Sequence, residues 1–330
     1  MFCNWFWIAS SPSMPRREPG QWRDSWLPAD AESEPPQPCR CAPCNVFRVC
    51  VSPMFVLVFG IVAVNYAPYV LWLPHEGMLG MACVVVFHVL VALLLGSYVM
   101  CVFTDPGTTP LEWHQRVASD ERLASEFALC RRSNMYRPLR SHFCSVTRRV
   151  VLNMDHFCPW VVNTVGFYNR KFFILFLIYT LSATLWVLIT NGPLLLRMYQ
   201  DHAFARSLER QWGAQRYMFG MMAAFVDLAL AFMLSCFAPF HIRMAMLNET
   251  TIEGPSPMFD VGERRNWQQV FGTDSRLWFL PVYGGGPDGD GIHWPSRQVQ
   301  GPEARYELEE GRLLGRGGMV SSDSSADEEE

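Results

Sequence analysis

Three residues within a four-residue stretch carry the chemistry of a nucleophilic site: Asp155, His156 and Cys158. An imidazole can take the proton of a thiol, and a carboxylate can orient that imidazole, so the triplet could act as one nucleophilic unit. An isolated triplet of this kind is more often a turn in which an acid and a histidine stand beside a buried cysteine. The neighbouring residues are therefore needed to distinguish a nucleophilic unit from a simple turn.

The surrounding motifs favour the nucleophilic unit. Pro159 and Trp160 follow the triplet directly, and the pattern Asn-x-Val-Gly-x-x-Asn occupies residues 163–169 before an apolar segment. This order resembles the catalytic segment of the DHHC protein S-acyltransferases, with Phe157 where the family has a second histidine. Three further motifs resemble those of the family and follow its order: Asp105-Pro106-Gly107, the TTxE-like stretch Asn248 to Glu253, and Phe259 to Gly272.

The resemblance implies an enzyme that moves a long-chain fatty acyl group from acyl-CoA to cysteines of protein substrates. In that scheme His156 removes the proton of Cys158, Asp155 fixes the imidazole, and an acyl-enzyme forms on Cys158. Acyl-CoA is then a co-substrate, and the sequence predicts no cofactor. Arginine or lysine side chains near the segment should meet the phosphates of CoA.

The resemblance also assigns supporting roles to four residues outside the triplet. Thr251 should contact Asp155, and Asn266 should tether the C-terminal segment to the core near the membrane. The two others are Asp105, as a local anchor, and Trp160, as part of the wall around the acyl chain.

The chain departs from the family at its zinc ligands. In the family the segment holds two zinc ions, each bound by three cysteines and one histidine, and zinc needs nitrogen, sulfur or carboxylate donors in a tetrahedral array. One ligand survives in each set, and His142 makes only a poor three-donor set with Cys130 and Cys144. We predict no structural zinc and expect the apolar replacements Phe143, Val150 and Phe157 to pack where ligands would sit. Carried over, the positions are Cys130, Ser133, Phe143 and Val150 for one ion and Cys144, Thr147, Phe157 and Thr164 for the other.

Four apolar runs set the fold class. Each has about 20 to 25 residues, enough for a helix to cross a hydrocarbon core roughly 30 Å thick. Buried helices of a soluble protein are the alternative, but they seldom run this long and this apolar on every face. The sequence predicts an all-α integral membrane protein with four transmembrane helices and the catalytic segment between the second and third. The runs are Met54 to Leu73, Met81 to Phe103, Phe172 to Leu196 and Met218 to Ile242.

The distribution of arginine and lysine predicts the orientation in the lipid bilayer. There are 5 before the first span, 10 between the second and third, 8 after the fourth, 0 in Pro74 to Gly80 and 4 in Arg197 to Tyr217. Positive residues concentrate on the cytoplasmic side, so both termini and the catalytic segment should be cytosolic. The resemblance implies a membrane of the Golgi or the ER, or the plasma membrane. Cys130, Cys144 and Cys158 then face a reducing compartment and should be free thiols. The net charge of -4 gives no indication of nucleic-acid binding.

The expected organisation has six parts. The N-terminal arm should be disordered. We favour its juxtamembrane cysteines, Cys39, Cys41, Cys44 and Cys50, as acylation sites, with unmodified thiols as the alternative; their spacing lacks the two pairs of a zinc site. The parts are an arm (1–53), two spans (54–103), the catalytic segment (104–171), two further spans (172–244), the TTxE and Asn266 motifs (245–283) and a disordered acidic tail (284–330).

One carboxylate lies inside the fourth span, where an ionised group is expensive. At about 1.5 Å per residue, Asp227, His88 and Asn65 lie at similar depths from the lumenal helix ends. We expect either a polar cluster of these three residues or a neutral Asp227 bonded to the backbone or a hydroxyl group. The small residues Ser182 and Ala183 on the third span either leave room for the end of an acyl chain or mark helix packing.

Two alternative functions stay open at this point. One is a catalytically inactive membrane scaffold of the same fold, which acyl label on Cys158 would exclude. The other is a thioester hydrolase, in which water accepts the acyl group. Release of free fatty acid without a protein substrate would identify it.

Overall fold

The computed structural model describes residues 52–72, 77–255 and 257–295. These residues belong to one compact unit of the chain, Cys39–Glu330. The expectations for the N-terminal arm, including Cys39, Cys41, Cys44 and Cys50, fall on residues outside the described ranges.

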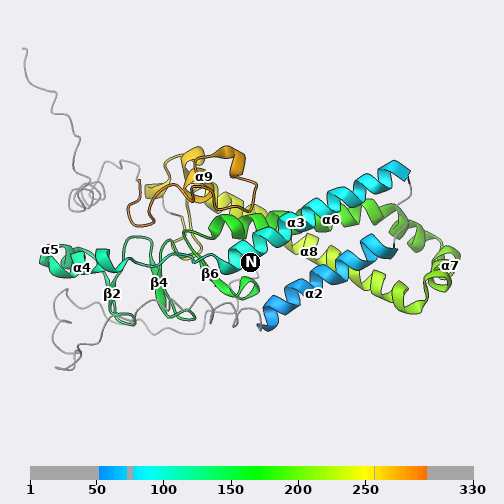
Figure 1. The fold of residues 1–330 in the computed structure, drawn as a ribbon, viewed down its shortest axis with the longest axis horizontal. Coiled ribbons are helices and arrows are strands. Elements are labelled where there is room, and N and C mark those ends of the chain that lie inside the picture. Colours follow the sequence, from blue (N-terminus) through cyan, green and yellow to red (C-terminus); the bar gives the residue numbers. More distant parts are fainter. Residues whose placement is uncertain (1–51, 73–76, 256, 296–330) are drawn as a thin grey trace, which may run out of the picture. The chain divides into compact units, whose positions relative to one another are not determined.

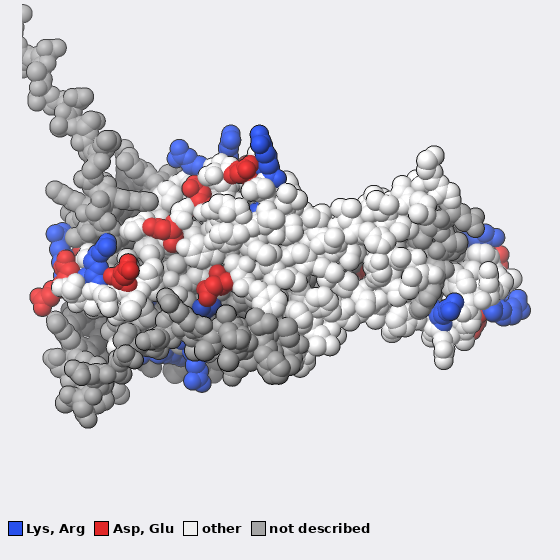
Figure 2. Space-filling model, viewed as in Figure 1, with Lys and Arg blue, Asp and Glu red and all other residues white. Residues whose placement is uncertain are grey.

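Four long apolar helices dominate the fold (Figure 1). They are α2 (Pro53–Ala67), continued by the π-helical turn η1 (Pro68–Trp72), α3 (Gly77–Phe103), α6 (Arg170–Gln200) and α8 (Ala214–Met246). Each apolar stretch is long enough to cross a membrane. Figure 2 shows charged side chains at both ends of the visible face and a largely uncharged band between them. The prediction of a four-span membrane protein is confirmed.

The segment between the second and third spans departs from an all-helical expectation. Two short helices, α4 (Leu111–Ser119) and α5 (Glu121–Glu126), precede three antiparallel hairpins. Each hairpin turns through a residue with positive φ, at Asn134, Arg148 and Val162, a conformation that tight hairpin turns require. The hairpins pair β1 (Leu129–Cys130) with β2 (Met135–Tyr136), β3 (His142–Cys144) with β4 (Arg149–Val151), and β5 (His156–Cys158) with β6 (Asn163–Val165).

The connection between the third and fourth spans is helical rather than irregular. Helix α7 (His202–Trp212) begins at Asp201, whose carboxylate accepts hydrogen bonds from the N–H groups of Ala203 and Phe204, both at 2.9 Å. Such capping satisfies N–H groups that have no partner inside a helix. The charged residues of this connection therefore lie largely on an amphipathic helix.

The C-terminal part folds further than expected. After the fourth span come η3 (Pro257–Phe259), α9 (Glu263–Phe271) and η4 (Ser275–Leu277). The predicted start of the tail at residue 284 is too early, because Ile292 is only 8% exposed and the Trp294 ring lies 5.6 Å from that of Phe167. The stretch after residue 284 is rich in glycine, which is typical of an irregular tail, but here glycine allows close packing. Gly291 has a φ of +76°, and a Cβ there would lie 3.0 Å from the Phe167 ring.

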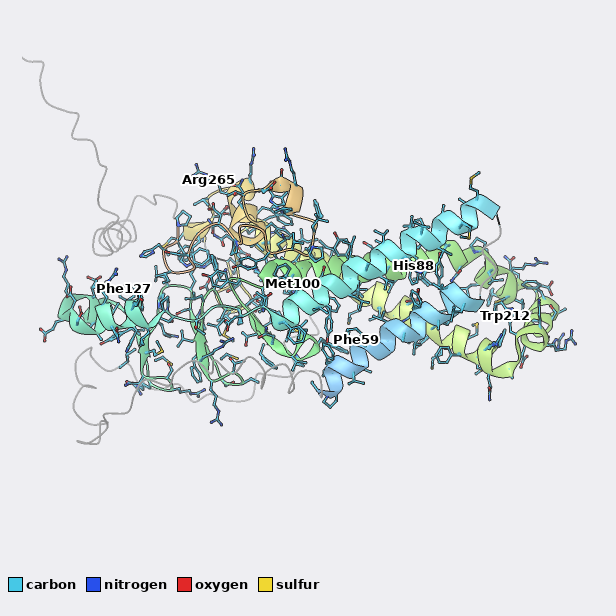
Figure 3. The ribbon with its side chains drawn as sticks, in the orientation of Figure 1. Phe59, His88, Met100, Phe127, Trp212 and Arg265 are labelled. Atoms are coloured by element: carbon cyan, nitrogen blue, oxygen red, sulfur yellow. The ribbon has the colours of Figure 1, made fainter. Side chains whose placement is uncertain are left out.

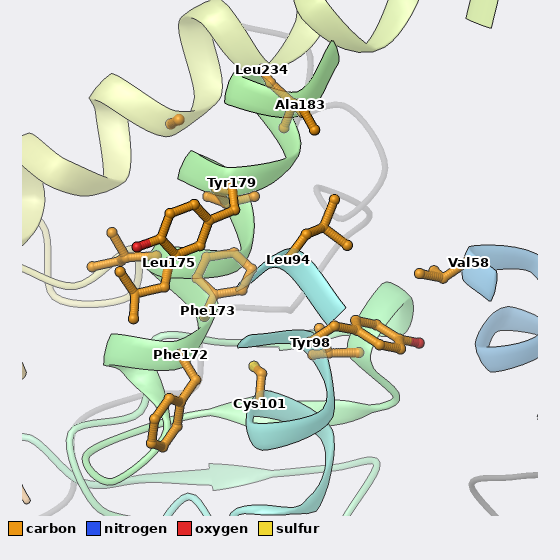
Figure 4. Close-up of a cluster of buried hydrophobic side chains, with 14 of the residues drawn as sticks. Val58, Leu94, Tyr98, Cys101, Phe172, Phe173, Leu175, Tyr179, Ala183 and Leu234 are labelled. Carbon is orange, nitrogen blue, oxygen red and sulfur yellow. The ribbon is translucent and has the colours of Figure 1, made fainter. Parts of the chain in front are cut away.

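A buried cluster joins the catalytic segment to the spans (Figure 4). Tyr98 and Cys101 of α3 pack with Phe172 and Phe173 of α6, all at most 1% exposed, in the same cluster as Cys158. Further along α6, Ala183 also belongs to the cluster. Such close-packed contacts fix β5 relative to the helices.

The predicted polar cluster of Asp227, His88 and Asn65 does not include His88. His88 is exposed on α3 (Figure 3), where its ring nitrogens lie 2.8 Å from the Tyr66 hydroxyl and 2.7 Å from the carbonyl oxygen of Val84. Similar depth along the membrane does not fix the direction in which a side chain points around its helix. Asp227 and Asn65 do line one cavity.

Candidate active site

Strand β5 brings the nucleophilic triplet together. Side chains two residues apart lie on the same side of a strand, so His156 and Cys158 share one face. His156 Nδ1 lies 3.0 Å from Asp155 Oδ2, and the same ring also interacts with the thiol of Cys158. Asp155 is fully buried and Cys158 is 6% exposed, whereas the His156 side chain keeps 27% of its surface accessible. The imidazole therefore stands between a buried acid and a nearly buried thiol.

The surroundings favour the charged forms of both Asp155 and His156. Burial alone would lower the pKa of His156, but hydrogen bonds with Asp155 and Cys158 outweigh it and raise that pKa to about 10. Burial would raise the pKa of Asp155, but the hydrogen bond from His156 and the charge of Arg170 bring it well below its usual range. This arrangement stabilises the state in which His156 has taken a proton.

Asp155 is held on both its main chain and its side chain by the TTxE-like stretch. The Thr251 N–H donates to Asp155 Oδ1, and the Thr251 hydroxyl donates to the Asp155 carbonyl oxygen, both at 2.6 Å. The Asp155 N–H donates to the carbonyl oxygen of Val165 on β6 at 2.9 Å. The contact that the resemblance implied between Thr251 and Asp155 is therefore present.

The hairpin is also tied to the end of α3. The Asn163 side chain donates to the carbonyl oxygens of Cys101, Val102 and Thr104 at 3.2, 3.1 and 3.0 Å, which caps the last turn of that helix. The Tyr98 hydroxyl donates to the Trp160 carbonyl oxygen at 3.1 Å, and the Trp160 side chain is 46% exposed. The nucleophile thus lies at one end of the spans.

Comparison with known proteins identifies this arrangement. The family model described as DHHC palmitoyltransferase matches residues 124–256. Probable protein S-acyltransferase 14 of Arabidopsis thaliana is 34% identical over 298 residues, 77% of this chain and 95% of the relative. Palmitoyltransferase ZDHHC20 of Homo sapiens is 29% identical over 309 residues, 78% of this chain and 81% of the relative. The chain belongs to the DHHC palmitoyltransferase family. At the level of the family, the prediction of an S-acyltransferase is confirmed.

The sequence interpretation missed His241 of α8. Its ring is 1% exposed, its Nδ1 lies 3.7 Å from Asp155 Oδ2, and this nitrogen makes no hydrogen bond to the described residues. The rings of Phe173, Phe237 and Phe240 surround it. His241 lies near the end of α8, seven residues before the TTxE-like stretch begins at Asn248, and this closeness to the motif could have drawn attention to it.

Arg140 was also missed, and it joins three parts of this DHHC protein. Its guanidinium donates to Glu253 Oε2 at 2.9 Å and to the side-chain and main-chain oxygens of Asn248 at 2.8 and 2.7 Å. It also stacks between the rings of Phe259 and Trp294, at 4.6 and 4.4 Å from their centroids. The catalytic segment, the TTxE-like stretch and the C-terminal segment therefore meet at one buried side chain.

Asn266 and Asp105 make local contacts. The Asn266 amide donates to the Met246 carbonyl oxygen at 2.7 Å and to Asp260 Oδ1 at 2.6 Å, which fastens α9 to the end of α8. Asp105 accepts from the Gly107 N–H at 2.8 Å and from Arg149 Nη1 at 2.7 Å. These contacts place Asn266 and Asp105 in supporting positions away from the thiol.

The first set of former zinc positions contains too few donors for zinc. Phe143 and Val150 lie directly opposite each other in the register of β3 and β4. Phe143 and Cys130 line a cavity of about 460 Å³ with Arg131, Arg132 and Arg137. Cationic side chains do not bind zinc. His142 also lines the cavity but does not stand at a family ligand position, so one thiolate of the four family ligands is left.

In the second set, the surviving thiol makes hydrogen bonds within the chain. Cys144 Sγ accepts from the Thr164 hydroxyl at 3.2 Å and from the Thr147 N–H at 3.5 Å. Phe157 packs against the small cluster of Cys144, Val151 and Met154. Within the described ranges, no group of three or more His, Cys, Asp and Glu side chains could hold a metal ion. The donors present do not fit four-coordinate zinc.

Proposed function

We propose that this protein transfers a long-chain fatty acyl group from acyl-CoA to cysteines of other proteins, through a thioester on Cys158. The observation that carries the proposal is the contact of His156 with both Asp155 and Cys158 at the end of the spans. A base beside a thiol raises the fraction of thiolate, which is the nucleophilic form. The family relationship supports the same chemistry.

Proton transfers through His156 connect the two steps. His156 takes the proton of Cys158, and the thiolate attacks the thioester carbonyl of acyl-CoA. The bond between the carbonyl carbon and the CoA sulfur breaks, and the leaving CoA thiolate receives the proton from His156. Neutral His156 then takes the proton of an acceptor cysteine, whose thiolate attacks the carbonyl carbon of the acyl-enzyme. The bond from that carbon to Cys158 Sγ breaks, and the leaving Cys158 thiolate receives the proton back from His156. Ionised Asp155 stabilises the imidazolium in both steps.

The position of Cys158 suits a lipid substrate. Its thiol belongs to the same buried cluster as Tyr98 of α3 and Phe173 of α6, and Trp160 beside it is partly exposed. An acyl chain that extends from Cys158 among the spans leaves water, and each buried CH₂ contributes about 0.8 kcal/mol. The soluble CoA moiety would remain outside the membrane.

The cavity beside Cys130 supports a place for the phosphates of CoA. Arg131, Arg132 and Arg137 line it, and the Nε of Arg137 is buried without a hydrogen-bond partner in the described part of the chain. Arginine side chains recognise phosphate groups through paired hydrogen bonds. Arg132→Gln should raise the KM for acyl-CoA several-fold and leave kcat nearly unchanged. An unchanged KM would place the CoA phosphates elsewhere.

Catalysis without structural zinc is part of the proposal. Cys144 is engaged by Thr164 and Thr147, and Val150 is buried opposite Phe143, so contacts within the chain occupy both sets of former ligand positions. The contacts among Asp155, His156 and Cys158 are made directly between protein atoms.

The arginine and lysine distribution supports a cytosolic catalytic segment and cytosolic termini. Glycosylation acceptor sites introduced before α2 and within α7 would test this topology. Modification of the α7 site alone is expected. Modification before α2 would reverse the assigned orientation.

The decisive experiment labels the purified full-length protein with radioactive palmitoyl-CoA and measures the metal content of the same sample. Hydroxylamine-sensitive label should appear on the wild type, disappear in Cys158→Ser and persist in Cys236→Ser, because Cys236 is an exposed thiol on α8. Zinc should be far below one ion per chain.

Other outcomes identify the alternatives. A folded wild type that takes up no label would be a scaffold. Label that is lost as free fatty acid even with an acceptor protein present would identify a hydrolase. Stoichiometric zinc would overturn the metal-free part of the proposal.

A further inference from the structure

A second polar site lies among the spans, away from the catalytic hairpins. Asp227 of α8 is 2% exposed, and none of the hydrogen bonds or ion pairs among the described residues involves it. It lines a cavity of about 60 Å³ together with Asn65 of α2 and Asn191 of α6. A buried carboxylate inside a membrane span normally has a partner.

The cavity contains two acceptor groups that are not hydrogen-bonded in the described residues, Asn65 Oδ1 and the Asp227 carboxylate. The Asn65 amide donates its N–H to the Ile61 carbonyl oxygen at 2.9 Å, and its Oδ1 is buried with no hydrogen-bond partner in the part of the chain that the structure describes. Asp227 adds a carboxylate to the same cavity. The Asn191 amide and the Arg216 guanidinium also line the cavity, but no hydrogen bond or ion pair in the described residues joins either of them to Asp227 or to Asn65 Oδ1. Two such acceptors fit a ligand that is a cation or a hydrogen-bond donor.

The cavity has room for a small hydrated ligand. One water molecule needs about 10 to 15 Å³ of such space, so about 60 Å³ holds a small ion together with several water molecules. Carboxylate and carbonyl oxygens are the ligands that hard metal cations prefer.

The charge at the site favours a monovalent ion. One carboxylate balances a single positive charge, whereas a divalent cation would leave a net positive charge at membrane depth, which is costly. Arg216 also lines the cavity, but 11 residues separate it from Asp227 on the same helix, about 16 Å along its axis. The structure contains no ion pair between them in the described residues.

The first span is irregular where it meets this cavity. Pro68 and Tyr69 of the π-helical turn η1 are part of the lining, and π-helical turns inside helices occur frequently at functional sites. The Tyr69 hydroxyl lies 3.1 Å from the Thr190 hydroxyl of α6, which fixes the wall of the cavity on that side. The local geometry thus holds the first span against α6 beside Asp227.

From these contacts we propose that Asp227 and Asn65 bind a monovalent metal cation, with Na⁺ as the probe. The site is separate from the candidate active site. Trp212, which also lines the cavity, lies at the end of the helices opposite Phe127 of the catalytic segment (Figure 3). Along α6, 17 residues separate Arg170 from the lining residue Val187, which is about 25 Å. The proposal is therefore independent of acyl transfer.

Binding of ²²Na⁺ to the full-length protein in detergent tests the site. We expect saturable binding that approaches one ion per chain and a higher unfolding temperature in NaCl than in N-methyl-D-glucamine chloride of equal ionic strength. Asp227→Asn should abolish both effects, and Asn65→Leu should weaken binding at least tenfold. Glu209→Gln removes an exposed carboxylate on α7 and should change neither.

Several results would overturn the proposal. Wild type without saturable ²²Na⁺ binding, or with the same unfolding temperature in both salts, would mean that Asp227 is a neutral acid. Undiminished binding in Asp227→Asn would place the ion elsewhere. If Asp227→Asn does not fold, unchanged binding in Asn65→Leu decides against the site. Competition by KCl equal to that by NaCl would support a monovalent site that does not distinguish the two ions.

Discussion

At the scale of single residues, His156 makes stability depend on pH. Its pKa is raised from 6.5 to about 10 in the folded protein, so its contribution is complete below about pH 6.5 and is lost as the pH rises through 10. Between pH 7 and pH 10 the wild type should lose thermal stability relative to His156→Gln. His202→Gln, at an exposed position on α7, should follow the wild type. Parallel curves for wild type and His156→Gln would contradict the assignment of charge.

His241 should act as a positioning residue for Asp155. Replacing it with Phe keeps an aromatic ring in the cage but removes the ring nitrogen 3.7 Å from the carboxylate, so ionised Asp155 loses a polar neighbour. Acyl-enzyme formation should slow about tenfold, equivalent to about 1.4 kcal/mol, and the acid limb of its pH profile should move to higher pH. Single-turnover labelling with palmitoyl-CoA measures both effects.

The matched variant for this test is His241→Gln, which restores a polar N–H group at the same position. It should recover much of the rate and return the acid limb towards the wild-type position. A purely structural role for His241 would lower the unfolding temperature in both variants without moving the pH profile.

The two histidines show what sequence can predict at this scale. His156 was found because its partners, Asp155 and Cys158, lie within the same short stretch. His241 contacts that stretch across 86 positions of the chain, and no local spacing connects them. Thr251 lay equally far away and was placed by a motif rather than by physical reasoning.

At the scale of elements, Arg140 fastens the hairpins to the segment that follows α8. Arg140→Lys keeps the charge but loses the planar fork that serves Glu253 and Asn248 together. A hydrogen bond to a charged group typically contributes about 1.5 to 3 kcal/mol, so loss of the shared hydrogen bonds should lower the unfolding temperature markedly. Arg148→Lys is the matched control, because Arg148 is exposed on the neighbouring hairpin. A similar fall in both variants would argue against a special role for Arg140.

Helices with a long sequence pattern could be predicted, whereas short strands could not. Four apolar runs identify four spans, although α6 extends from Arg170 to Gln200, beyond the predicted Phe172 to Leu196, because polar residues continue the helix outside the apolar core. The hairpins have strands of only two or three residues, too short for an alternating pattern to indicate them. Their turns depend on positive φ at Asn134, Arg148 and Val162, which residue type alone does not predict for Arg and Val.

At the scale of the whole molecule, the C-terminal segment holds the catalytic segment and the third span together. The Lys171 ammonium group at the start of α6 donates to the carbonyl oxygens of Leu277 and Val282 at 2.8 and 3.0 Å, and the Tyr179 hydroxyl donates to that of Phe279. Beyond these contacts the chain returns to the catalytic segment through Ile292 and Trp294. The segment that contains Ile292 and Trp294 therefore helps to position the active site.

Two truncations test this contribution. A chain that ends after Pro295 keeps the described contacts and should unfold at the wild-type temperature, whereas one that ends after Tyr283 loses both Ile292 and Trp294. Burial of Ile292, 8% exposed, is worth about 1.5 to 3 kcal/mol, and the Arg140 contact with Trp294 at 4.4 Å adds up to about 2 kcal/mol. The shorter chain should therefore unfold at a clearly lower temperature and label Cys158 more slowly. Trp294→Ala in the full chain should reproduce part of the loss, since it removes the stacking while Ile292 stays buried. Equal stability of the two truncated chains would show that residues 284–295 add nothing to the fold.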